Sequence, residues 1–296
     1  MKKSADEYSR SQVNKTGVID TNLLHNYKLS EDIFLRHNIT PEGKNHGMVM
    51  LLDWSGSMSK ISIETVKQVI TLVQFCRKIQ IPFDVYTFTS GGVNPVHESV
   101  DELDHTISYN QSSIVQVLSS TAKKREIDED IFNLYNSAHN VADSRTTVYA
   151  SRYMEMGGTP LNNVLMVIPK LIERFRHITN TQKVSFVCVT DGESSPLVFH
   201  KKYTYYDGTE TIKDAYSYHQ TVMIRDGFNV HPISSMGSDT IDVVRWLKTK
   251  LTDVSITNLY LGGLSASSHY LKEQTNYEKF VDEKVFRRSG CYVSTS

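Results

Sequence analysis

The sequence lacks any long apolar run and any excess of charge of one sign. Its 32 lysines and arginines are nearly balanced by 33 aspartates and glutamates, so it has no global basic field of the kind that binds nucleic acid non-specifically. No apolar stretch approaches the roughly 18 residues of a membrane helix, and residues 1–10 lack the apolar core of a signal peptide. We therefore expect a cytoplasmic protein that makes no membrane contact and shows no strong nucleic-acid signal.

Several kinds of chemistry also lack their usual residues. The three cysteines, Cys76, Cys188 and Cys291, have no metal-ligand spacing, and two of them lie in apolar runs, which predicts reduced core thiols. The histidines form no His-x-x-x-His pair of the zinc-binding kind. The serines near residue 55 lack the Gly-x-Ser-x-Gly pattern of a hydrolase. We predict no catalytic residue and a protein that is not an enzyme.

One stretch organises the rest of the chain. An apolar run, Met48 to Leu52, has the composition of a strand buried on both faces, and it ends abruptly in a polar loop. That loop carries Asp53, Ser55 and Ser57 within five residues. Open α/β sheets usually bind ligands at the carboxyl ends of their strands, so this loop is a candidate binding site.

The elements expected after this loop alternate between helix and strand. Helices are predicted over 61–79, 161–176 and 241–251, and strands over 83–88, 184–189 and 255–261. This alternation predicts an α/β fold with a doubly wound, mostly parallel, Rossmann-like sheet. The fold would carry helical and β-hairpin insertions.

The predicted domain boundaries follow the same pattern. Residues 1–46 form an N-terminal arm, 47–263 the domain, and 264–296 a C-terminal extension. Insertions fall at about 89–155, which has no obvious strand of its own, and at 194–237. Asp207-Gly208 and Asp226-Gly227 in the second insertion are two-residue hairpin signals. The tyrosines around the first signal fit either a simple pleated insertion or a partner interface.

Two further loops supply oxygen-bearing side chains. Thr159 follows a Gly-Gly pair, and Asp191 follows the predicted strand at 184–189. A doubly wound sheet would gather Asp53, Ser55, Ser57, Thr159 and Asp191 on one edge. Mg²⁺ takes about six oxygen ligands, and Mn²⁺ or Ca²⁺ would also accept such a set. The hydroxyls would bind the ion, the aspartates would hold metal-bound waters, and an open position would take a carboxylate from another molecule. The alternative is that these residues only cap helices and form turns.

Three motifs in this order, DWSGS, GGTPL and TDGES, resemble the metal-ion-dependent adhesion site of the von Willebrand factor type A family. In that family the hydroxyls coordinate the ion, and the aspartates act directly or through water. The resemblance implies these roles for Asp53, Ser55, Ser57, Thr159 and Asp191. It covers roughly residues 47–263.

A narrower likeness rests on GVIDTNLL and NHGMVMLLDWSGSM, which resemble the cobaltochelatase CobT subunit and its counterparts in T4-like phages. It implies a Mg²⁺-dependent protein-binding adaptor, possibly phage-encoded, that partners a ring-forming AAA+ ATPase of the MoxR or CobS type. One alternative is a chelatase subunit that takes part in metal insertion into a tetrapyrrole. Another is a structural or assembly component of a phage particle.

Overall fold

The structure is a computed structural model, and contacts between Cα atoms divide it into two compact units, Met1–His46 and Gly47–Ser296. The description below covers residues 12–19, 34–39, 45–91, 106–109, 111–143, 154–191, 194–219, 221–226, 228–233, 239–261 and 291–295.

The first unit contains a two-stranded antiparallel sheet. Strand β1, Gln12–Ile19, pairs with β2, Phe34–Ile39, and the register shifts between Lys15 and Ile19. The sequence predicted an arm here and indicated neither strand. Both strands mix β-branched and polar residues without clear alternation, and this irregularity is why the period of two is hard to recognise.

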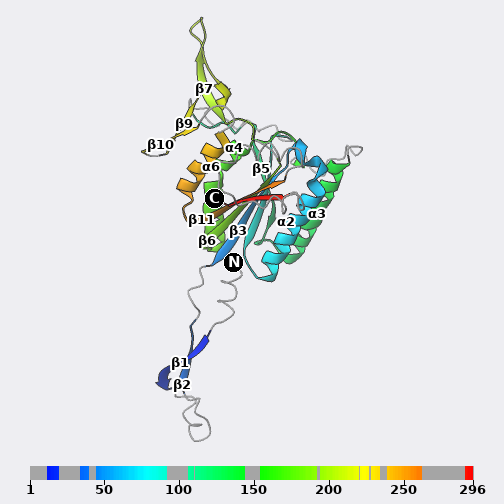
Figure 1. The fold of residues 1–296 in the computed structure, drawn as a ribbon, viewed down its shortest axis with the longest axis vertical. Helices are drawn as coiled ribbons and strands as arrows, with labels where there is room; N and C mark the ends of the chain where they lie inside the picture. Colours follow the sequence, from blue (N-terminus) through cyan, green and yellow to red (C-terminus); the bar gives the residue numbers. More distant parts are fainter. Residues whose placement is uncertain are drawn as a thin grey trace. The chain divides into compact units, whose positions relative to one another are not determined.

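The second unit is built on a six-stranded sheet with the order β12-β11-β6-β3-β4-β5 (Figure 1). These strands are β3 His46–Asp53, β4 Phe83–Thr89, β5 Ser113–Ser119, β6 Lys183–Thr190, β11 Val254–Leu261 and β12 Cys291–Thr295. β3 is parallel to β4, and β6 is parallel to β11, whereas β5 and β12 run antiparallel to their neighbours. The expected α/β fold with a mostly parallel sheet is therefore confirmed.

Helices cover both faces of this sheet (Figure 1). They are α2 Ser62–Lys78, α3 Lys124–Ala142, α4 Leu161–Leu165, α5 Ile168–Thr179 and α6 Asp239–Lys250, with a 3₁₀ turn, η2 Gly56–Lys60, before α2. Apolar residues of α2 and α3 share one core with Met48, Met50 and Leu52 of β3. Residues of α4, α5 and α6 share the other core with Val49 and Leu51. Successive side chains of β3 thus enter opposite cores, which explains the near-continuous apolar run in its sequence.

Strand β5 corrects the prediction that residues 89–155 contain no strand. Its sequence, SIVQVLS, is rich in β-branched residues, but it lies at the edge of the sheet and most of its side chains are half-exposed. A half-exposed edge strand needs neither a fully apolar run nor strict alternation, so its signal is weak. Residues 92–105, 110 and 144–153 of this predicted insertion lie outside the described part of the chain.

The single helix predicted over 161–176 is also corrected, because the chain forms two helices there. α4 ends at Leu165, and α5 begins at Ile168 with Pro169 in its first turn. Proline has no backbone N–H, so Pro169 cannot bond to the carbonyl four residues earlier and its ring crowds that position. The break between α4 and α5 follows from this proline.

The second insertion forms the predicted antiparallel ribbons. β7, Val198–Thr204, pairs with β8, Glu210–Tyr216, and β9, Val222–Asp226, pairs with β10, Asn229–Ile233; the 3₁₀ turn η4, Ser217–His219, follows β8. The turn of the first ribbon is longer than two residues. Tyr205 N–H still donates to the Thr209 carbonyl, which leaves Tyr206, Asp207 and Gly208 in the turn. Gly208 has φ +78°, a conformation that favours glycine.

The predicted C-terminal extension, 264–296, is described only at β12, which pairs with β11. Gly192 and Glu193 of the TDGES motif lie outside the described residues. None of the described helices is both long and apolar enough to cross a membrane.

Candidate functional site

Asp53 is the last residue of β3 and is fully buried. Its Oδ1 accepts a 3.0 Å hydrogen bond from the backbone N–H of Ser55, and its Oδ2 accepts a 2.6 Å bond from Thr190 Oγ1. The two bonds fix both carboxylate oxygens. Asp53 thus holds together the loop that follows β3 and the end of β6.

Ser55, Ser57 and Asp191 form a chain of hydrogen bonds that begins beside this carboxylate. The hydroxyls of Ser55 and Ser57 share a 3.0 Å hydrogen bond, and Ser57 Oγ donates a 2.8 Å bond to Asp191 Oδ1. Ser55 is buried, Ser57 is exposed and Asp191 is half-buried, so the chain runs from the interior to the surface. Four of the five predicted residues are therefore linked at one edge of the sheet.

Close backbone contacts bring the loop with Thr159 to the same edge. Gly56 N–H donates to the Gly157 carbonyl at 2.8 Å, and Ser55 forms an isolated parallel bridge with Gly157. A Cβ atom on Gly157 would lie only 2.7 Å from the Cα of Gly91, so this approach requires glycine. Ser90 completes the contact, since its Oγ accepts a 2.6 Å bond from Gly158 N–H.

The contacts of Gly157 and Gly158 form a clamp between the two loops. Thr159 is half-buried and directly follows this clamp. Its carbonyl accepts a 2.7 Å bond from Ser195 N–H. The structure thus brings the backbone of Thr159 beside the loop of Ser55, while the hydrogen bonds described above join the side chains of the other four residues. All five predicted residues lie at the carboxyl ends of β3 and β6 or in the loop clamped to them.

Burial makes the charged forms of the two aspartates unfavourable. Burial raises the pKa of Asp53 to about 6, and hydrogen bonds from Thr190 and Ser55 offset part of that rise. The nearby charge of Asp191 raises it as well. Burial likewise raises the pKa of Asp191, against the hydrogen bond from Ser57. A cation between these groups would relieve both effects.

Two residues of this edge were missed from the sequence. Thr190 orients Asp53, and Ser90 at the end of β4 holds the loop of Gly158. Thr190 directly precedes Asp191, so a search for polar side chains at every strand end would have found it. Ser90 follows the predicted strand 83–88 by two residues and offers the same signal.

The donor set fits a hard cation better than a soft one. Hydroxyl and carboxylate oxygens suit Mg²⁺, Mn²⁺ or Ca²⁺, whereas zinc prefers nitrogen and sulfur ligands. Among the described residues there is no group of three or more histidine, cysteine, aspartate or glutamate side chains arranged to hold a metal. A cation held by the described residues here would therefore draw ligands from serine or threonine hydroxyls, backbone carbonyls or water as well as from the two aspartates. Cys76 and Cys188 are free and buried in the core, as predicted.

No protein-family model and no curated protein matches the chain. Solved structures with similarity include two bacterial pilus adhesins. SpaC from Lactobacillus rhamnosus GG, in an open conformation, has a TM-score of 0.40 and 14% identity over 73% of this chain. RrgA from Streptococcus pneumoniae has a TM-score of 0.30 and 11% identity over 57% of this chain. The chain spans 24% and 22% of the length of these adhesins. At these scores the similarity assigns no function to it.

These comparisons contradict the assignment to the von Willebrand factor type A family and its CobT-like group. The two structures named above are described as pilus adhesins, and no family model supports the assignment. The predicted role as a metal-dependent adaptor for an AAA+ ATPase is corrected with it, and neither the chelatase subunit nor the phage component gains support. The physical reason is that the motifs are short. Polar residues that cap helices and form turns follow buried strands in many α/β proteins.

Proposed function

We propose that the edge formed by Asp53, Ser55, Ser57, Thr159 and Asp191 is a binding site for a hard divalent cation, Mg²⁺ foremost, with Mn²⁺ or Ca²⁺ as substitutes. The observation that carries the proposal is the chain of hydrogen bonds from Ser55 through Ser57 to Asp191, which lies beside the buried carboxylate of Asp53. This chain brings oxygen atoms from the ends of β3 and β6 within hydrogen-bond distance of one another.

The residues would have different tasks at this site. The hydroxyls of Ser55, Ser57 and Thr159 are neutral oxygen ligands, and Asp191 supplies a charge close to the surface. Asp53 is already engaged by Ser55 N–H and Thr190, so it would act by orienting the loop and by holding metal-bound water. Water, or a carboxylate from another molecule, would fill the remaining positions. The proposal assigns no catalytic step to the site.

We also propose that the sheet is doubly wound, as the sequence predicts. Its support is that α2 and α3 share one core with β3, whereas α4, α5 and α6 share the opposite core. In a doubly wound sheet the strand ends open toward a crevice, and this crevice is where ligands usually bind.

Direct binding of Mn²⁺ tests the cation site. Electron paramagnetic resonance counts free Mn²⁺ in titrations of the whole chain, and competition with Mg²⁺ gives the relative affinity. Ser57→Ala removes one hydroxyl from an exposed position with little effect on the core, and Asp191→Asn removes one charge. We expect each variant to bind Mn²⁺ at least about tenfold more weakly, the equivalent of about 1.4 kcal/mol.

Asp84→Asn is the matched control, because Asp84 is also a buried aspartate with a raised pKa but lies at the opposite end of its strand, next to Phe83. It should bind Mn²⁺ as the wild type does. Equal binding by wild type, Ser57→Ala and Asp191→Asn would overturn the proposal, as would no binding at millimolar Mn²⁺.

A further inference from the structure

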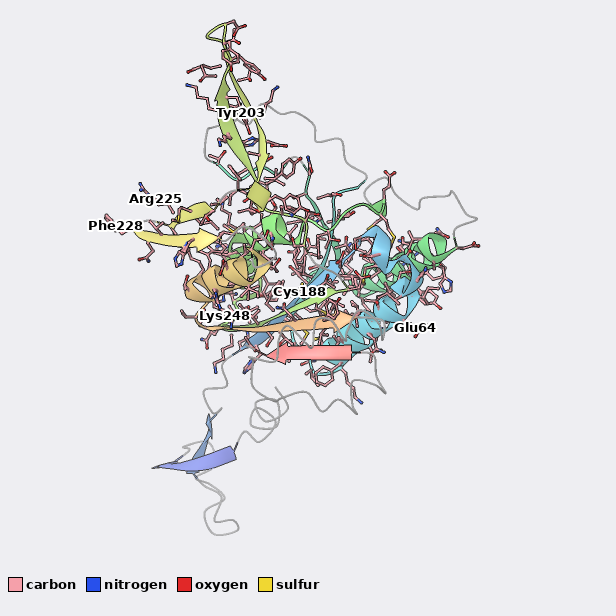
Figure 2. The ribbon with its side chains drawn as sticks, turned by 45° about the horizontal axis from the view of Figure 1, so that its top comes forward. Glu64, Cys188, Tyr203, Arg225, Phe228 and Lys248 are labelled. Atoms are coloured by element: carbon pink, nitrogen blue, oxygen red, sulfur yellow. The ribbon has the colours of Figure 1, made fainter. Side chains whose placement is uncertain are left out.

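The ribbon of β9 and β10 carries apolar side chains on the face that points away from the domain core. Met223 and Val230 are 61% and 49% exposed, and Phe228, at the turn, is fully exposed. The register places Met223 opposite Pro232 and Arg225 opposite Val230, so these four share one face. Figure 2 shows Arg225 and Phe228 at the outer end of this ribbon.

The other face of the same ribbon accounts for how it is held. Ile224 and Ile233 are buried in the core that includes Val243 and Leu247 of α6. Asp226 forms an ion pair with Lys250 at the end of α6. The ribbon is therefore anchored through its inner face, and its outer side chains are not needed for that attachment.

A sheet face that meets only water is normally polar, so the outward face of β9 and β10 departs from the usual alternation. Three of its four paired positions are apolar, and the fully exposed Phe228 adds to them. Contiguous exposed apolar side chains of this kind mark interaction surfaces. Arg225 is the one charged residue among the four paired positions, and the register puts no carboxylate on this face.

The neighbouring ribbon has a face of the same character. Pairing of β7 with β8 puts Lys201, Tyr203, Thr211 and Lys213 on one face, again without a carboxylate. Lys213 Nζ donates a 2.6 Å bond to Tyr205 Oη and lies 5.3 Å from the centre of that ring. Both ribbons thus combine apolar or aromatic surface with positive charge. A second copy of the same surface would bring like charges together, whereas an acidic surface would complement it.

We propose that the outward face of β9 and β10 is a docking surface for a protein segment that presents apolar side chains beside at least one carboxylate. The apolar side chains would cover Met223, Val230 and Phe228, and the carboxylate would pair with Arg225. A polyanion such as nucleic acid is a poorer fit, because the whole chain has a net charge of −1.

Selection from a displayed library of random linear peptides tests this proposal without knowledge of the natural partner. The whole wild-type chain is the target, and EDTA is present throughout, so the result does not depend on the proposed cation site. We expect the selected peptides to be rich in apolar residues and to contain more aspartate and glutamate than lysine and arginine. Synthetic versions should bind Met223→Ser and Arg225→Glu at least about tenfold more weakly than wild type.

Ile178→Ser is the matched control, since Ile178 on α5 is 51% exposed and lies outside the ribbon. It should bind the same peptides as wild type does, and thermal unfolding of all variants checks that they fold. The proposal is overturned if no peptide is enriched, if the peptides are not acidic, or if the ribbon variants bind as Ile178→Ser does. It is also overturned if wild type self-associates through this face in sedimentation, or binds vesicles containing phosphatidylserine in an Arg225-dependent way.

Discussion

Thr190 Oγ1 donates a 2.6 Å hydrogen bond to Oδ2 of Asp53. The two residues are the last of β6 and of β3, which are neighbours in the sheet. The bond turns an otherwise costly buried carboxylate into a fixed link between two strand ends. It also leaves Asp191, the next residue along the chain, beside Ser57.

Replacing Thr190 with valine should destabilise the protein by about 1–3 kcal/mol, because a buried carboxylate oxygen loses its donor while the side-chain volume is conserved. Urea unfolding followed by circular dichroism measures this change. Thr190→Ser keeps the hydroxyl and should recover most of the loss. If Thr190→Val and Thr190→Ser unfolded at the same urea concentration, the hydrogen bond from Thr190 to Asp53 would make no net contribution to stability.

Gly157→Ala should destabilise the protein by more than about 2 kcal/mol, because the added Cβ would lie 2.7 Å from Gly91 Cα and neither backbone can move without separating two loops. The comparison is Gly208→Ala, where the Cβ meets no atom within 4 Å and only the positive φ is strained, at a cost of about 1 kcal/mol. Thermal unfolding compares the two. An equal or larger loss for Gly208→Ala would show that the clamp at Gly157 relaxes easily.

Much of the fold could be predicted from the sequence because buried parallel strands leave long apolar runs. Met48 to Leu52 enters two cores, so every position is apolar and the strand is easy to recognise. The same reasoning placed the polar loop after it, and four of the five predicted site residues lie in one hydrogen-bonded group.

The parts that could not be predicted depend on contacts between distant residues. β5 is recognised as a strand through its pairing with β4, and its half-exposed side chains carry little signal of their own. The approach of Gly157 to Gly91 could not be predicted either, because it depends on the packing of two loops that are distant in the sequence. Short motifs around Asp53 misled the family assignment, because local polar patterns are shared by unrelated proteins.

Asp84 gives a prediction for the pH dependence of stability. Burial raises its pKa, and the hydrogen bond that Tyr86 Oη donates to Asp84 Oδ2 offsets only part of that rise. A carboxyl whose pKa is higher in the folded state stabilises the fold below the unfolded value of 3.8, and this stabilisation is lost as pH rises through the folded value. The asparagine of Asp84→Asn does not titrate. The free energy of unfolding of this variant should therefore rise relative to that of wild type as pH rises from about 4 to 7. Urea unfolding at several pH values measures it, and a constant difference would show that Asp84 has an ordinary pKa.

Asp191→Asn distinguishes a cation site from a network that is merely structural, because the two interpretations predict opposite changes in the stability of the variant in EDTA. Asp191 is half-buried, and burial raises its pKa. Its negative charge also repels that of Asp53. An asparagine keeps an oxygen that can accept the bond from Ser57 but removes the charge. In EDTA, the variant should therefore unfold at the same or a higher temperature than wild type.

Mg²⁺ at a hundred times its dissociation constant should stabilise the wild type by about 2.7 kcal/mol, since it binds only the folded state. The variant should lose most of this gain. A variant that is less stable in EDTA yet keeps the full gain from Mg²⁺ would show that Asp191 only supports the loop of Ser57 and does not hold the ion.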